Sequence, residues 1–202
     1  MTPPLVAKEL TLETRAEILD AAQNRFRTYG MKKTTMAEIA EDVGMSAANI
    51  YRYFDNKLDL AAACASRCMG ERIDLLREVV RRPNLSASDK LLEFLRTSIT
   101  FVHEQTCNQP KINELVDVVT HSRPELVQEK IESAQALYAE ILAQGNNSGE
   151  FDIEDVLETA RDLHAATVIF ELPFFVGLYS EEEYQEMATS LIKTLVRGLR
   201  KL

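Results

Sequence analysis

Apolar residues recur every three or four positions along most of the 202-residue chain. This spacing places them on one face of a helix, and the strict alternation typical of half-buried strands is missing. Residues 1–10, with Pro3 and Pro4, are expected to form a loose arm. The pattern predicts an all-α protein of about nine helices, at about 12–29, 35–43, 47–54, 57–81, 86–102, 110–121, 124–144, 153–178 and 181–201.

Residues 35–57 carry the strongest local signals. Thr35 and Glu38 form a T-x-x-E capping box, in which each side chain reaches the backbone N–H of the other residue. Gly44 can adopt the left-handed conformation that ends a helix, and Ser46 is suited to begin the next one. A short helix, a turn with glycine and a second short helix are typical of a helix-turn-helix motif.

The second helix of this motif, at 47–54, is more polar than packing requires. Ile50 and Phe54 can be buried, but the remaining surface carries groups that hydrogen bond or stack, namely Asn49, Tyr51, Arg52 and Tyr53. An α-helix fits the major groove of DNA, where base edges present distinct donors and acceptors. We therefore expect this helix to bind double-stranded DNA.

Longer motifs surround the helix. They read T-R-A-E-I-L-D-A-A-x-x-x-F at 14–26, Y-G at 29–30, T-T-M-A-E-I-A-E-D-V-G-M-S at 34–46 and I-Y-R-Y-F-D-N-K-L-D-L at 50–60. In this order they resemble the DNA-binding domain of the tetracycline-repressor (TetR) family. The resemblance implies an all-helical, homodimeric transcriptional regulator, usually a repressor, whose larger second domain binds a small molecule and forms the dimer.

The resemblance divides the chain into a helix-turn-helix DNA-binding domain at 11–60 and a helical effector-binding and dimerisation domain at 61–202. Many family members have a basic residue and then Gly where this chain has Ala47 and Ala48. Ala48 still allows close approach to DNA, so the docking of the helix should be kept. The missing basic residue affects one phosphate or guanine contact, and therefore the operator sequence.

Each candidate in the motif fits a particular contact. Arg52 can bond a guanine bidentately and Asn49 an adenine, and the two residues are three apart on one face. Ala47 and Ala48 can touch a thymine methyl group. The residues expected to contact phosphates are Thr35, Ser46, Tyr51, Tyr53 and Lys57. Thr35 and Ser46 could instead act only as helix caps, and Tyr53 could belong to the core.

The net charge of −9 at pH 7 argues against nucleic acid until its distribution is considered. Residues 1–60 hold 8 Lys and Arg against 9 Asp and Glu, and residues 61–202 hold 15 against 23. The N-terminal part is thus nearly neutral and has no basic footprint. Binding should rest on well-placed contacts from two recognition helices, about 34 Å apart on a palindromic operator.

The apolar content of 46% allows a sizeable core. The N-terminus has no apolar segment typical of a signal peptide, and the most apolar stretch, at 165–178, is broken by Glu171 and Pro173. We therefore expect no membrane span. With three cysteines and no export signal, we expect reduced thiols and a cytoplasmic location.

The last two predicted helices, at 153–178 and 181–201, are the expected dimer interface. Residues 163–178 are apolar on more than one face, so they need cover on several sides. The residues assigned to the interface are Leu163, Ile169, Phe174, Tyr184, Leu191 and Leu195. These residues could instead only complete the core of one copy. The segment G-N-N-S-G-E-F-D at 145–152 is expected to be a turn.

A small-molecule cavity in the second domain could be lined by residues from several predicted helices, namely Phe94, Phe101, His103, Cys107, His121, Phe170 and Glu171. The chemically active residues do not form a catalytic set. Cys64 and Cys68 are four apart without a nearby His, so a zinc site is weakly indicated. No glycine-rich phosphate loop or hydrolase motif occurs. We expect no enzymatic activity, no cofactor and no metal.

Two functions remain open. In the first, an effector binds the second domain and changes the spacing of the two recognition helices. In the second, a dimeric DNA-binding protein takes no small ligand and is controlled by a protein partner or by thiol state. A sizeable cavity with a few polar groups would favour the first, and a fully packed domain the second.

Overall fold

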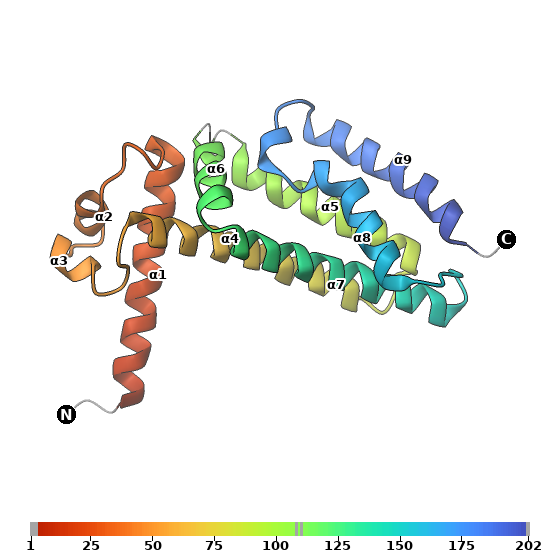
Figure 1. Cartoon of the computed structure of the whole chain (residues 1–202), viewed down its shortest axis with the longest axis horizontal. Helices are drawn as coiled ribbons and strands as arrows, with labels where there is room; N and C mark the ends of the chain where they lie inside the picture. The colour runs from red at the N-terminus through yellow and green to blue at the C-terminus, as the bar shows by residue number, and fades with distance from the viewer. Residues whose placement is uncertain (1–3, 108, 110, 201–202) are drawn as a thin grey trace. The chain divides into compact units, whose positions relative to one another are not determined.

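The computed structural model describes residues 4–107, 109 and 111–200, with side chains from residue 12 onward. All regular structure in this part of the chain is helical (Figure 1), which confirms the all-α prediction. The elements found there are α1 (Pro4–Tyr29), α2 (Met36–Asp42), α3 (Ala47–Ile50), α4 (Lys57–Arg81), α5 (Ala87–Thr106), α6 (Ile112–Ser122), α7 (Pro124–Ser148), α8 (Val156–Thr167), the short 3₁₀ helices η1 (Val168–Phe170) and η2 (Pro173–Phe175), and α9 (Glu181–Leu199).

The first helix is longer than its sequence pattern suggests. α1 begins at Pro4, so the predicted loose arm is wrong for residues 4–10, and residues 1–3 lie outside the described residues. Proline is well tolerated in the first turn of a helix, because the N–H that it lacks would have no partner there. Pro4 therefore begins the helix instead of preventing it.

The single helix predicted at 153–178 is wrong. α8 ends at Thr167, whose hydroxyl donates to the carbonyl oxygen of Leu163 at 2.8 Å, and η1 and η2 follow. Pro173 opens η2 and has no N–H to continue a helix, and Leu172 before it is extended, as residues before proline tend to be. The apolar stretch therefore ends in two separate turns.

The turn predicted at 145–152 is wrong for its first half, because α7 continues to Ser148. The second half carries Glu150, whose carboxylate accepts the backbone N–H groups of Ala87 at 2.7 Å and Ser88 at 3.0 Å. These N–H groups open α5, where no intrahelical acceptor is available. The turn thus caps a helix that lies more than sixty residues earlier in the chain.

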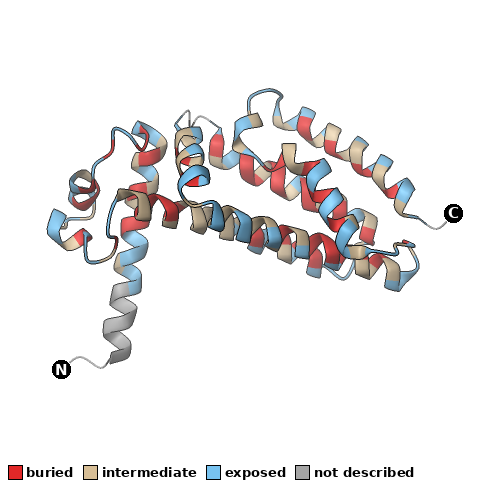
Figure 2. Ribbon diagram, viewed as in Figure 1, coloured by how far each residue is buried: buried red, intermediate tan, exposed pale blue. Residues whose placement is uncertain are grey.

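The chain divides into two compact units, each with buried side chains of its own (Figure 2). Unit 1 comprises Met1–Cys68 and Gln109–Leu126, and unit 2 comprises Met69–Asn108 and Val127–Leu202. α6 therefore belongs to unit 1, although it follows α5 in sequence. The division at residue 60 stays a prediction about function, since compactness groups the chain differently.

Each unit buries its own apolar cluster. The least exposed side chains of unit 1 include Ile18, Ala22, Phe26, Ile39, Ala40, Ile50, Leu60 and Ala61, and those of unit 2 include Leu76, Leu91, Phe94, Leu95, Tyr138, Ile141, Leu142 and Ala188. Burying one large aliphatic or aromatic side chain contributes roughly 1.5–3 kcal/mol. Among the described residues, no helix combines the length and the apolar character that crossing a membrane requires.

Candidate nucleic-acid interface

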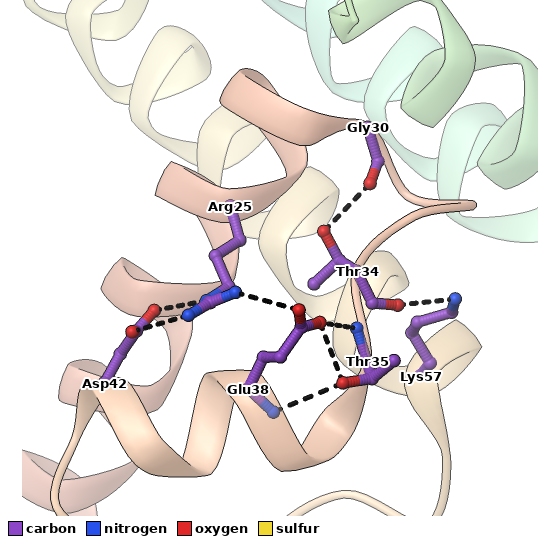
Figure 3. Close-up of polar contacts among 7 residues, drawn as sticks. All are labelled: Arg25, Gly30, Thr34, Thr35, Glu38, Asp42 and Lys57. Atoms are coloured by element: carbon purple, nitrogen blue, oxygen red, sulfur yellow. Dashed lines mark hydrogen bonds and ion pairs between the residues drawn. The ribbon is translucent and has the colours of Figure 1, made fainter.

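The N-terminus of α2 is built by the predicted capping box (Figure 3). The backbone N–H of Glu38 donates to Oγ1 of Thr35 at 3.3 Å. In return, the backbone N–H and the hydroxyl of Thr35 both donate to Oε2 of Glu38, each at 2.8 Å. Two backbone donors at this end are thus used within the protein. A phosphate would meet the N–H groups of Met36 and Ala37, which open the helix.

Arg25, on α1, holds both acidic side chains that face it from α2. Its guanidinium donates to the two carboxylate oxygens of Asp42 at 2.5 and 2.8 Å, and lies 3.5 Å from Oε1 of Glu38. The hydrogen bond from Arg25 keeps the pKa of Asp42 below its ordinary value, and the bonds from Thr35 do the same for Glu38. Both carboxylates stay charged, and Arg25 balances part of their negative charge.

The turn of the motif is a Schellman arrangement. The backbone N–H of Gly44 donates to the carbonyl oxygen of Glu41 at 3.0 Å, and that of Met45 donates to Ala40 at 2.8 Å. Gly44 has a φ of 65°, a left-handed conformation that glycine adopts without steric cost. Ser46 then caps α3, because its hydroxyl accepts the N–H of Asn49 at 3.3 Å. This turn fixes where α3 begins.

α3 itself is shorter than the predicted helix at 47–54, because its α-helical part ends at Ile50. The N–H groups of Arg52 and Tyr53 bond to carbonyl oxygens three residues earlier, at 3.1 and 3.0 Å, so the chain tightens into 3₁₀-type turns. The N–H of Phe54 returns to Ile50 at 3.2 Å. Ile50 and Phe54 are buried, and they anchor this short element to the core of unit 1.

The residues assigned to bases share the outer face of this element. Ala47, Ala48 and Arg52 are exposed, and Asn49 is half-buried. Nη1 of Arg52 lies 3.5 Å from Oδ1 of Asn49, at the long limit of a hydrogen bond, so the two polar ends are adjacent. Tyr51 is also exposed. Four of these five side chains are therefore exposed, and the fifth, Asn49, lies next to Arg52.

The remaining candidates lie at the edge of this surface. Thr35 and Ser46 are exposed, and Tyr53 is half-buried against the core. Lys57 has a role that its sequence position does not suggest. Nζ donates to the carbonyl oxygen of Thr34 at 2.7 Å (Figure 3) and to that of Met31 at 2.8 Å. A lysine ammonium has three donors, so two of the three hold the loop that precedes Thr35.

Glu114, on α6, is a second support that the sequence analysis missed. Oε1 of Glu114 accepts the backbone N–H of Lys32 at 2.7 Å. A Cβ at Gly30 would lie 2.7 Å from Oε2 of the same residue, and Gly30 has a φ of 85°. Only glycine fits there without displacing Glu114. Lys32 and Glu114 are 82 positions apart, so no local pattern indicates the contact.

The residues assigned to the dimer interface divide into two groups in unit 2. Leu163 and Tyr184 are buried within the core of one copy, and the hydroxyl of Tyr184 donates to the carbonyl oxygen of Phe175 at 2.6 Å. Ile169, Leu191 and Leu195 are half-buried against this core, and Phe174 is 49% exposed. The second group thus retains apolar surface that faces outward.

The residues assigned to a ligand cavity are dispersed. Phe94, Phe170 and Glu171 lie inside unit 2, whereas Cys107 is exposed. His103 pairs with Glu181 at 3.4 Å. His121 belongs to unit 1, where its side chain is 77% exposed and Nδ1 donates to the carbonyl oxygen of Asp117 at 2.8 Å.

Phe101 is the one candidate of this set that lines a groove of about 560 Å³ in unit 2. The other lining residues are Leu75, Glu93, Arg96, Thr97, Thr100, Glu104 and Gln185. These side chains come from α4, α5 and α9, and most of them are polar. Sequence reasoning did not identify this groove, because its members are spaced over three helices without a shared motif.

Two protein-family models match the chain, one in its N-terminal part and one in its C-terminal part. The family described as "Bacterial regulatory proteins, tetR family" matches residues 18–64, and the family described as "Tetracyclin repressor-like, C-terminal domain" matches residues 87–192. The first match contains α2, the turn and α3. The second covers more than half of the chain and lies mostly in unit 2.

Individual proteins show the same relationship. The HTH-type transcriptional regulator TtgR of Pseudomonas putida is 45% identical over 56 residues, which are 28% of this chain and 27% of TtgR, so the match spans about a quarter of that relative. The HTH-type transcriptional repressor BepR of Brucella suis is 27% identical over 167 residues, 77% of each chain. A crystal structure from Mesorhizobium loti, described as a TetR-family transcriptional regulator, has the same fold, with a TM-score of 0.79, 20% identity and coverage of 95% of this chain and 98% of that one. The chain is therefore a member of the TetR family of DNA-binding transcriptional regulators.

Proposed function

We propose that the protein is a homodimeric repressor that binds a palindromic operator and leaves it when a small molecule binds unit 2. The observation that carries the proposal is the surface formed by α3 and the turn after it, where the polar ends of half-buried Asn49 and exposed Arg52 lie next to each other. Neither side chain supports the fold, as the core beneath them is formed by Ile50 and Phe54. Polar groups displayed in this way are available to base edges.

The base contacts follow from the chemistry of each side chain. Arg52 bonds O6 and N7 of a guanine, and Asn49 bonds N6 and N7 of an adenine. Ala47 and Ala48, which present only methyl groups, pack against thymine methyl groups. Because the four side chains lie within two turns of one element, they address neighbouring base pairs of one half-site.

The phosphate contacts set the register of the helix. Thr35 and Ser46 stand at the N-termini of α2 and α3, where the free backbone N–H groups of the first turn can donate to a phosphate. The hydroxyl and the backbone N–H of Thr35 itself are already bonded to Glu38. Tyr51 offers a hydroxyl from an exposed side chain, and Tyr53 offers one from a ring that packs partly against the core. Lys57 contributes its third N–H and holds the loop before Thr35 with the other two.

Dimerisation brings two such surfaces to one operator. The outward apolar group of unit 2, namely Ile169, Phe174, Leu191 and Leu195, is the part of the predicted interface that a second copy could cover. Leu163 and Tyr184 support it from inside the same copy. Two recognition helices held about 34 Å apart match half-sites separated by one turn of DNA.

Control by a small molecule is favoured over control by thiol state. Burial raises the pKa of the Cys64 thiol to about 12. The thiolate is the reactive form of cysteine, so Cys64 would react slowly with oxidants at neutral pH. Unit 2, by contrast, contains the groove beside Phe101 and a set of buried polar side chains. An effector acts by binding one of two conformations more tightly than the other.

Selection of binding sites from random double-stranded DNA tests the proposal. We expect an inverted repeat whose half-sites are centred one helical turn apart or a multiple of it. The Arg52→Ala variant should select a repeat that has lost one position in each half-site. Glu41→Ala, at an exposed residue of α2, is the matched control and should select the wild-type sequence. Recovery of no inverted repeat would overturn the proposal.

A further inference from the structure

Unit 2 contains a buried polar cluster formed by Arg72, Ser98, Tyr138, His164, Thr167 and Glu171. These residues come from α4, α5, α7, α8 and the segment between η1 and η2. The Glu171 side chain is 3% exposed and that of Arg72 is 12% exposed. A buried charge of this kind is expensive unless it is paired, and its retention inside an apolar core calls for an explanation.

Glu171 is the point on which the cluster converges. Nη1 of Arg72 donates to Oε2 of Glu171 at 2.8 Å and to the hydroxyl of Ser98 at 3.0 Å. Nε2 of His164 lies 3.7 Å from the same Oε2. Burial raises the pKa of Glu171, but the charge of Arg72 and the contact with His164 outweigh burial and hold this pKa below its ordinary value. Glu171 is therefore held as a carboxylate, and the groups around it, Arg72 and His164, are those that suit an anion.

The protein's own carboxylate fills this site with poor geometry. Its best contact with Arg72 comes from a single nitrogen, whereas a guanidinium binds a carboxylate best through two parallel bonds. Oε1 of Glu171 meets the hydroxyl of Tyr138 only at 3.5 Å. Tyr138 has one proton, and at 2.9 Å the oxygen of Thr167 is the closer acceptor for it. A carboxylate on a separate small molecule could bond Arg72 through two nitrogens and could lie closer to the hydroxyl of Tyr138.

The segment that carries Glu171 is short and is not part of a regular α-helix. Glu171 lies between two single 3₁₀ turns, so no continuous ladder of helical hydrogen bonds holds it in place. The next residue, Leu172, is already 36% exposed. Phe170, on the other side, is buried and lies edge-on to Tyr184, with ring centres 6.0 Å apart. Outward movement of this short segment would remove one acid and one aromatic ring together.

We propose that residues 170–171 act as a built-in substitute for the effector, and that the effector is a small carboxylic acid with an apolar body. This inference rests on the proposed function for its link to DNA release. The acid replaces Glu171 at Arg72, and its apolar part replaces Phe170 beside Tyr184, whose ring centre lies 6.0 Å from that of Phe170. Displacement of the segment between α8 and α9 is the change that the operator-binding surface would sense.

Calorimetric titration of the full-length protein with sodium 3-phenylpropionate tests the site itself. We expect the Glu171→Ala variant to bind this acid with a Kd at least tenfold lower than the wild type, because no internal carboxylate has to leave. 3-Phenylpropan-1-ol, which has the same body and no charge, should bind neither protein. Adding Arg72→Gln to Glu171→Ala should abolish binding of the acid.

Two further variants serve as an alternative to Glu171→Ala and as a control. Glu171→Gln keeps the volume of the side chain and removes its charge, so it should still bind the acid at least threefold more tightly than wild type if Glu171→Ala does not fold. Glu186→Gln removes an exposed carboxylate from α9, outside both the cluster and the groove, and should bind like wild type. Equal affinity of wild type and both Glu171 variants for the acid, or equal binding of the alcohol, would overturn the anion site.

The link to DNA is measured separately, by titrating the acid into the wild-type protein bound to its selected operator. Release of the operator supports the inference in full. If the acid binds the Glu171 variants tightly and the wild-type complex stays intact at saturation, residues 170–171 are not an effector substitute, although operator binding itself is unaffected. If no operator is recovered in the selection experiment, the proposed function fails while the calorimetric result still stands.

Discussion

The outer face of α3 and the Glu171 cluster use similar side chains under opposite conditions. Around α3, Arg52 is exposed and Asn49 is half-buried, and the two side chains meet only at 3.5 Å. In unit 2, Arg72 and Glu171 are enclosed by the core and bonded at 2.8 Å. Charged groups in water cost the fold little and are free to bind a partner, whereas buried ones must be satisfied before folding is complete. The first surface should therefore govern DNA affinity, and the second should govern stability.

The largest expected effect comes from breaking the buried pair. Arg72→Met should lower the free energy of unfolding by roughly 3–5 kcal/mol, because Glu171 is left buried without its cation. Urea denaturation followed by circular dichroism measures this difference. The double variant Arg72→Met/Glu171→Leu should recover most of the loss, since neither charge remains. A loss below about 1 kcal/mol for the single variant would show that Glu171 reaches water, contrary to its burial in the structure.

The matching change on α3 should leave stability almost untouched. Arg52→Ala should alter the free energy of unfolding by no more than about 0.5 kcal/mol, as expected for an exposed residue. It should weaken DNA binding by roughly 1–3 kcal/mol at one base position and relax the preference there. Fluorescence anisotropy with operators altered at single positions makes the measurement. An equal loss of affinity on every sequence would identify Arg52 as a phosphate contact.

Lys57 stands between the two extremes, because it is half-buried and bonds two carbonyl oxygens. Lys57→Met should destabilise the protein by about 1–2 kcal/mol, since the carbonyl groups of Met31 and Thr34 lose a donor. It should also weaken binding to all DNA sequences alike and flatten the salt dependence. Lys33→Met, at an exposed lysine in the loop that Lys57 bonds, is the control for stability. Unchanged unfolding in urea would assign Lys57 to phosphate alone.

Lowering the pH should also reduce the stability that the Arg72–Glu171 pair contributes, by a smaller amount than the substitutions above. The pKa of Glu171 is held below its ordinary value of about 4.3 in the folded protein. Below that ordinary value the unfolded state takes up a proton first, so stability falls as the pH drops toward the folded pKa. Urea denaturation from pH 6 to pH 3 should show a steeper loss for the wild type than for Arg72→Met/Glu171→Leu. Parallel pH curves for the two proteins would contradict this assignment.

The parts of the interface that could be predicted from sequence are those defined by a few adjacent residues. The capping box of Thr35 and Glu38, the left-handed Gly44 and the Ser46 cap each need partners within three or four positions, and all are present in the structure. The outer face of α3 follows in turn, because burial of Ile50 and Phe54 decides which side chains point outward.

The contacts that could not be predicted join residues far apart in sequence. Arg72 and Glu171 are separated by 99 positions, and Lys32 and Glu114 by 82. Helical periodicity cannot show such pairings, because each residue is compatible with its own helix wherever its partner lies. The apolar stretch at 165–178 misled the prediction for a related reason. Its composition indicates a long helix, but the burial of Glu171 and the backbone of Pro173 require two turns there.

The brevity of α3 has a consequence for how this regulator can change its target. The four-residue helix is fixed by the turn before it and by two buried anchors, Ile50 and Phe54, so its outer side chains carry almost no structural burden. Substitutions at residues 47, 48, 49 and 52 can therefore accumulate without bringing the fold near its stability threshold. With the proposed base contacts, the preferred operator sequence can change, in evolution or by design, without changes elsewhere in the molecule.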